Sequence, residues 1–142
     1  MQVLKLHMVL LFLLVFICAS AGTPDTSSDV CTWHDKDGQR HELHLQNGVK
    51  HGPYMIWDAD DNLVQIGFYS MNEKDASWKQ YNSNGDLIAE IQYVDGQRHG
   101  AWRFFHANGH LRAEIFYDSN EPIGHWSSFN ERQELIEYAY HE

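Results

Sequence analysis

The hydrophobic and polar positions of this chain repeat with a fixed period. The segment from Gly100 to Gly124 recurs along the sequence at intervals of 24 residues. Two aromatic columns run through four copies, one made of Tyr54, Trp78, Trp102 and Trp126 and the other of Trp57, Tyr81, Phe105 and Phe129. A divergent first copy begins near Val30. A fixed period of roughly 20–50 residues indicates a repeat array.

Each copy has the pattern of a β-hairpin. In the copy that begins at Gly100, an aromatic stretch precedes Asn108-Gly109, and apolar and polar residues then alternate over residues 111–117. Asn-Gly is the preferred pair for a type I′ turn, which we expect to join the two strands. A second kind of turn, containing Asp95-Gly96 and ending at Gly100, is predicted to join one hairpin to the next.

Stacking these hairpins predicts an all-β fold, an elongated and twisted antiparallel sheet over residues 30–142 in about five copies. About ten strands at ~4.8 Å spacing would give a ribbon roughly 50 Å long. Because Trp102 and Phe105 lie three positions apart on one strand, the two aromatic columns are expected on opposite faces. The atypical first and last copies are expected to cap the edges of the sheet.

Residues 1–21 have the pattern of a cleavable signal peptide. Lys5 precedes an apolar run over residues 8–18, and Ala19-Ser20-Ala21 fits the small-residue cleavage site. We therefore expect cleavage after Ala21 and export to a periplasm or to the outside, without membrane insertion of the mature chain. Residues 22–29 are polar and are predicted to form a disordered leader.

The charge of the chain narrows the classes of partner. The formal net charge is −10, and loss of Lys5 with the signal peptide makes it one unit more negative. Such a surface repels phosphate backbones and anionic lipids, so nucleic acid and bare membrane are poor partners. A basic protein is favoured, although the acidity is equally explained by solubility alone.

The reactive side chains do not form a catalytic or metal-binding pattern. His41 and His44 lie three apart on a predicted strand and so face opposite sides, whereas the related zinc motif needs two histidines four apart on a helix. Glu90 and Glu114 share one repeat position, which favours a structural or solvated row over an acid–base pair. We therefore expect no metal, no cofactor and no enzymatic activity. Cleavage would leave Cys31 as the only cysteine, either buried or a site for an intermolecular disulfide.

The tryptophan column has two interpretations. As core, it would hold neighbouring hairpins together, because each copy needs a buried face. As an exposed stripe, it would stack on sugar rings or anchor a protein partner.

The two central copies also resemble a known repeat family. The residues that carry the resemblance are Gly96-Gln97-Arg98-His99-Gly100-Ala101-Trp102, Asn108-Gly109-His110-Leu111, Glu114 and Tyr117, together with Asn84-Gly85-Asp86-Leu87, Glu90 and Tyr93. They resemble MORN repeats, in the variant class found in YwqK-type bacterial antitoxin proteins. The resemblance implies hairpins that serve as an interaction surface without catalytic residues, and neutralisation of a partner toxin.

Two function hypotheses follow. The first is an exported, non-enzymatic scaffold that binds another protein, including the case of an immunity protein that neutralises a basic toxin. The alternative is a structural or glycan-binding module of the cell envelope. In both, the two aromatic columns are the candidate binding or stacking residues.

Overall fold

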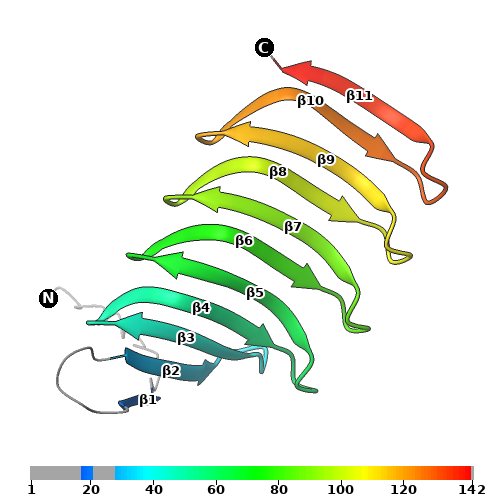
Figure 1. Ribbon diagram of the computed structural model, residues 1–142. Helices are drawn as coiled ribbons and strands as arrows, with labels where there is room; N and C mark the ends of the chain where they lie inside the picture. The colour runs from blue at the N-terminus through cyan, green and yellow to red at the C-terminus, as the bar shows by residue number, and fades with distance from the viewer. Residues whose placement is uncertain (1–16, 21–27, 142) are drawn as a thin grey trace, which may run out of the picture.

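The computed structural model describes residues 17–20 and 28–141 and places them in one antiparallel sheet of eleven strands. The strands lie side by side in the order of the sequence, and each is bent, so that the whole sheet is curved (Figure 1). They are β1 Ile17–Ser20, β2 Ser28–His34, β3 Arg40–Gln46, β4 Val49–Trp57, β5 Leu63–Ser70, β6 Glu73–Tyr81, β7 Leu87–Val94, β8 Gln97–Phe105, β9 Leu111–Asp118, β10 Glu121–Phe129 and β11 Leu135–His141. The predicted all-β array of consecutive hairpins is confirmed.

The sheet is a single layer. In the described part of the chain, no helix and no second sheet covers either face. The described residues contain no helix that is long and apolar enough to cross a membrane. Few side chains are buried, namely Cys31, His41, Leu43, Trp78 and Ala89. Contacts between neighbouring strands therefore hold the fold together in place of a central core.

The two aromatic columns face opposite sides, as predicted. Strand β4 pairs regularly with β3 from Tyr54 to Trp57, so residues three positions apart point to opposite faces. We call the face that carries Tyr54 and Trp78 the aromatic face. The opposite face, which carries Trp57 and Glu90, is called the charged face.

The turn types differ from the prediction. The loop at residues 106–110 has five residues, and its Gly109 amide donates to the His106 carbonyl at 2.9 Å. Gly109 has a positive φ but Asn108 does not, so this is not a type I′ turn. The two-residue turns between hairpins, such as Met71-Asn72 with φ of 49° and 73°, have this geometry instead. A two-residue connection requires it, whereas a five-residue loop does not.

A second correction concerns Gly100. The His-Gly step was expected to end a turn, but β8 continues through it. At this point the register shifts, because Ile91 pairs with Trp102 while Tyr93 pairs with Arg98. The extra residues of β8 form a bulge, and bulges bend the strand that carries them.

The N-terminal strands change the expectation for Cys31. In the structure Cys31 is disulfide-bonded and almost fully buried, and its partner in the β1–β2 register is Cys18. The interpretation of Cys31 as a lone cysteine assumed that the signal peptide had been removed. Most of the predicted signal peptide and of the predicted leader lies outside the described residues. Strand β1 falls within the predicted signal peptide, and β2 begins at Ser28, within the predicted leader.

The C-terminal edge is not capped. Strand β11 pairs only with β10 in the described sheet, and it exposes large apolar side chains. These are Leu135, Ile136, Tyr138 and Tyr140. The expectation that the last copy protects the edge is therefore wrong. The copy has lost its Asn-Gly turn but has kept an apolar strand.

Candidate interaction surface

A continuous row of aromatic rings crosses the aromatic face. Ring centroids lie 5.8 Å apart for Tyr54 and Trp78, 6.3 Å for Trp78 and Tyr93, and 5.5 Å for Tyr93 and Trp102. The row begins at Trp33 and ends with Tyr117, whose ring lies 5.0 Å from that of Trp102. Offset and edge-on rings at these distances attract one another by about 0.5–1.5 kcal/mol per pair. The row therefore links consecutive repeats across the sheet.

The tryptophan column is partly core and partly surface. Trp78 is 3% exposed because its ring lies over Gly67, where an added Cβ would be 2.1 Å from the indole. Position 91, the equivalent of position 67 beside Trp102, carries isoleucine, and Trp102 is only half-buried. Both indoles donate to carbonyl oxygens of the preceding repeat, Trp78 to Phe68 and Trp102 to Gln92. The core interpretation thus holds for Trp78, whereas Trp102 keeps part of its surface exposed.

Sequence reasoning missed a column of basic residues on this face. Lys50, Lys74 and Arg98 are spaced by one repeat, and each places its charge over a tyrosine ring of the row. Lys74 also lies 4.2 Å above Trp78, and burial lowers its pKa. The 24-residue spacing alone would have revealed the column, which ends at Pro122. The aromatic face is therefore locally basic on an acidic molecule.

The second aromatic column lies along the five-residue loops. The Arg40 guanidinium stacks 3.8 Å from the Trp57 ring centroid. Tyr81 and Phe105 line two shallow hollows of about 400 and 290 Å³ between successive loops. The residues that line the two hollows occupy equivalent repeat positions, so the two hollows are related by one repeat. Phe129 is half-buried at the end of β10, where its carbonyl accepts a hydrogen bond from His106 at 2.9 Å.

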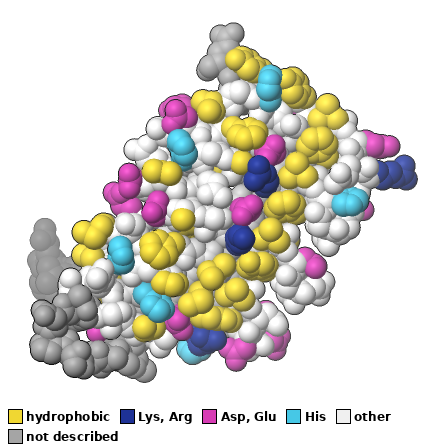
Figure 2. Space-filling model, in the orientation of Figure 1, with side chains coloured by type: hydrophobic (Ala, Val, Ile, Leu, Met, Phe, Trp, Pro, Cys, Tyr) yellow, Lys and Arg dark blue, Asp and Glu magenta, His cyan; other side chains and the backbone are white. Residues whose placement is uncertain are grey.

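The two candidate carboxylates belong to a row of ion pairs. Arg103 donates to Glu114 at 2.7 Å and lies 4.0 Å from Glu90, which also lies 3.6 Å from Lys79. Figure 2 shows one face on which basic and acidic side chains alternate between hydrophobic ones. All of these groups are partly exposed, so each pair contributes little stability. Their alternation favours one strand register over its neighbours.

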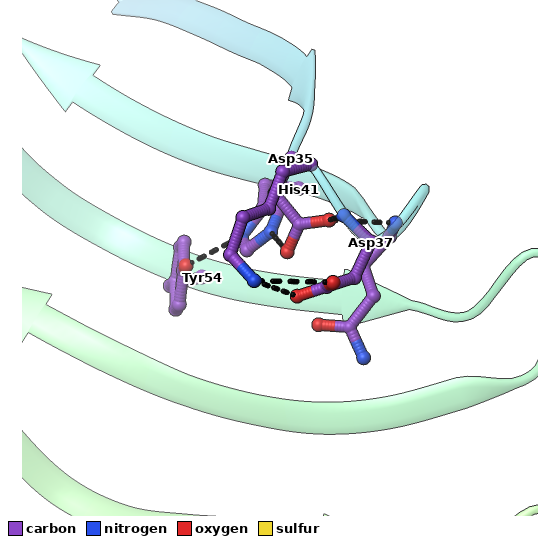
Figure 3. Close-up of polar contacts among 6 residues, drawn as sticks. Asp35, Asp37, His41 and Tyr54 are labelled. Atoms are coloured by element: carbon purple, nitrogen blue, oxygen red, sulfur yellow. Dashed lines mark hydrogen bonds and ion pairs between the residues drawn. The ribbon is translucent and has the colours of Figure 1, made fainter.

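A polar cluster closes one end of the aromatic row (Figure 3). His41 stacks on Trp33 at 4.9 Å, with its Nδ1 2.7 Å from the Tyr54 hydroxyl and its Nε2 3.1 Å from Asp35. The hydrogen bond from His41 lowers the pKa of Asp35, whereas burial raises the pKa of Tyr54 to about 12. A tyrosine with a raised pKa is a poor nucleophile at neutral pH, so the cluster is suited to packing.

The two candidate metal ligands of β3 do not converge. His44 lies 3.2 Å from Glu42, whereas His41 contacts Asp35 and Tyr54. In the described part of the chain, no group of three or more histidine, cysteine or acidic side chains could hold a metal ion.

A comparison with family models identifies the central hairpins. The model of the MORN repeat variant matches residues 74–95, which form β6 and β7, and residues 98–119, which form β8 and β9. A search of curated proteins finds no match. The matched segments carry most of the aromatic row, two members of the basic column and both candidate glutamates. The two hairpins between residues 74 and 119 are therefore MORN repeats of the variant class.

Proposed function

We propose that this protein is an exported, non-enzymatic scaffold that binds another protein through its aromatic face. The observation that carries the proposal is the unbroken row of rings on a sheet that no second layer of the described residues covers. Aromatic side chains dominate the binding energy of protein interfaces because they bury large areas at a small entropic cost. Here they are already ordered by contacts with one another, which lowers the cost of binding further.

The basic column suggests how the partner is oriented. Lys50, Lys74 and Arg98 lie over the rings, so carboxylates or carbonyl oxygens of the partner are expected above them. The molecule as a whole is acidic and attracts a basic protein over longer distances. The finer form of the proposal is that this partner is a basic toxin which the protein neutralises in the cell envelope. Its support is the resemblance to YwqK-type antitoxins together with the net charge.

The test uses two neighbouring residues of β9 that face opposite sides. The tagged protein is used to capture partners from envelope extracts at low and high salt, and mass spectrometry identifies them. Tyr117→Ala removes the last ring of the row, whereas Phe116→Ala removes an exposed ring from the charged face. We expect Tyr117→Ala to weaken binding of the captured protein about tenfold or more, with little effect from Phe116→Ala.

Equal binding by both variants would contradict the use of the aromatic face. Capture of wall fragments that free sugar releases, without a protein, would favour the glycan-binding alternative. Delayed toxicity of the captured protein when both are co-expressed would support the antitoxin form, and unchanged toxicity would contradict that form alone.

A further inference from the structure

Strand β11 leaves one edge of the sheet open. Each strand from β2 to β10 pairs with a neighbour on both sides, whereas β11 pairs only with β10 in the described sheet. Its exposed fractions are 58% for Leu135, 66% for Ile136, 54% for Tyr138 and 61% for Tyr140. An edge strand with apolar side chains and unpaired backbone groups is a template for another strand.

The side chains of this edge depart from the repeat in a consistent way. Tyr138 occupies the same repeat position as Glu90 and Glu114, two repeats after Glu90 and one repeat after Glu114. Inside the array those glutamates pair with basic residues of the preceding strand. In the last hairpin Ser127 stands at the repeat position of those basic residues, and the glutamate is replaced by a tyrosine whose ring can pack on an apolar neighbour. The substitution suits an edge that meets an apolar strand.

The tyrosines of the edge are held in place before any partner arrives. The His125 ring lies 4.8 Å from that of Tyr138 and 5.0 Å from that of Tyr140. The Tyr138 hydroxyl is also hydrogen-bonded to Nδ1 of His125. A preordered surface loses less entropy when it binds.

We propose that β11 pairs with β11 of a second copy of this chain, antiparallel about Tyr138, to form a two-fold symmetric dimer with one continuous sheet. Tyr138 is the midpoint of Leu135–His141, so this register pairs the whole strand. Ile136 then lies opposite the second copy's Tyr140, and Tyr138 lies opposite its own equivalent. These apolar side chains share one face, where cross-strand pairs of this kind stabilise a sheet.

The charges of β11 favour this register over its neighbours. Pairing about Tyr138 places Glu137 opposite Ala139 of the second copy. A register centred on Glu137 would place the Glu137 carboxylates of the two copies directly opposite each other, which is destabilising. A shift to Ala139 would leave Leu135 and Ile136 outside the paired region.

Pairing of β11 with the N-terminal edge of another copy would be head-to-tail and would continue from copy to copy into a ring or an open-ended filament. An edge that pairs with itself is isologous and closes at two chains. The aromatic faces of both copies then lie on the same side of the continuous sheet, which doubles the surface offered to a ligand.

Cysteine cross-linking of the full-length chain tests the register directly. Residues directly opposite in an antiparallel pair have Cα atoms about 4.5–5.5 Å apart, within the range that a disulfide spans. Under mild oxidation, Tyr138→Cys alone should give a covalent dimer. The Glu137→Cys variant alone and the Ala139→Cys variant alone should give no covalent dimer. A mixture of the two variants should cross-link. The wild-type chain provides the baseline for the native cysteines.

A second test of the proposal does not need introduced cysteines. Light scattering across a range of concentrations should show a monomer–dimer equilibrium for the wild-type protein. Tyr138→Lys should shift it to monomer, because charge on an edge opposes pairing. Met71→Lys, at an exposed turn residue far from β11, should leave it unchanged, and circular dichroism should show both variants folded. The proposal would be overturned if the wild-type protein stayed monomeric or formed open-ended oligomers. Cross-linking of the Glu137→Cys variant with itself would also overturn it.

Discussion

At the position shared by Gly52, Ala76, Gly100 and Gly124, the backbone has a positive φ in all four copies. The φ of Ala76 is 56°, close to the 63° of Gly124. An L-residue pays about 1–2 kcal/mol for this region, whereas glycine does not. The glycine column is therefore a backbone requirement of the bulge, and Ala76 meets it under strain.

Replacing Ala76 by glycine should consequently stabilise the protein. Relief of strain outweighs the greater freedom of glycine in the unfolded chain, so we expect the free energy of unfolding to rise by about 0.5–1 kcal/mol. Denaturant unfolding followed by tryptophan fluorescence measures the change. Gly124→Ala is the converse control, because no atom lies within 4 Å of its added Cβ, and it should destabilise by about 1 kcal/mol. A destabilised Ala76→Gly variant would contradict the strain argument.

The half-buried tyrosines of the aromatic face should make the protein sensitive to alkali. Burial raises the pKa of Tyr54 from 10.0 to about 12, and it also raises the pKa of Tyr69 and Tyr93. The unfolded chain releases these protons near pH 10, before the folded chain does. The stability that neutral Tyr54 contributes is therefore complete below pH 10 and is lost as the pH rises to about 12.

Unfolding free energies measured at a series of alkaline pH values check this expectation. Tyr54→Phe cannot titrate, so its stability should fall less steeply over this range, although it starts lower because the contact with His41 is lost. Parallel curves for the two proteins would show that Tyr54 does not contribute to the alkaline loss.

At the scale of the element, the two-residue turns bind one another from repeat to repeat. The Asn72 amide donates to the Lys50 carbonyl, and its side chain accepts from the Lys50 amide at 2.9 Å. Asn120 makes the same two bonds with Arg98. The Gly96 amide donates to the Lys74 carbonyl, but glycine has no side chain that could accept a hydrogen bond from the Lys74 amide. These bonds position the basic column over the aromatic row.

Gly96→Asn should supply the missing hydrogen bond. Asparagine tolerates the φ of 75° at this turn, and the added Cβ would meet Glu73 at an ordinary 3.5 Å. We expect a gain of about 1 kcal/mol in unfolding free energy and a higher melting temperature. Asn72→Gly removes the equivalent bond without backbone strain and should lose a similar amount. If both variants matched the wild type, the turn bonds would contribute no net stability.

At the scale of the whole molecule, the array has two different ends. The N-terminal end includes β1, which lies inside the predicted signal peptide and pairs with β2. At the C-terminal end of the described sheet, β11 pairs only with β10. Export with cleavage after Ala21 would remove β1 and make β2 the N-terminal edge strand.

Intact-mass measurement of the protein recovered from culture medium or periplasm checks the predicted processing. We expect the mass of residues 22–142, because Ala19-Ser20-Ala21 fits the cleavage site. Ala21→Asp is the control, since a charged residue at the cleavage site should block processing. A recovered wild-type chain that retained residues 1–21, with Cys31 still disulfide-bonded, would contradict the cleavage.

The array followed from the sequence because a repeat makes most of its contacts with its neighbours, so the period of its apolar residues specifies both hairpin and stack. The opposite facing of Tyr54 and Trp57 followed from strand alternation alone. The turn types were predicted wrongly because Asn108-Gly109 suits several loops, and the number of unpaired residues decides between them.

The sequence by itself determined the fold class, the direction of each strand and the residues of the two aromatic columns. Only the tertiary structure decided that Trp78 is buried over Gly67, that Lys74 lies on the rings, and that β11 is an open edge. These features arise where side chains of different strands meet, or where the described sheet ends. A periodic pattern repeats the same prediction in every copy, whereas the environment of each copy depends on what lies on either side of it.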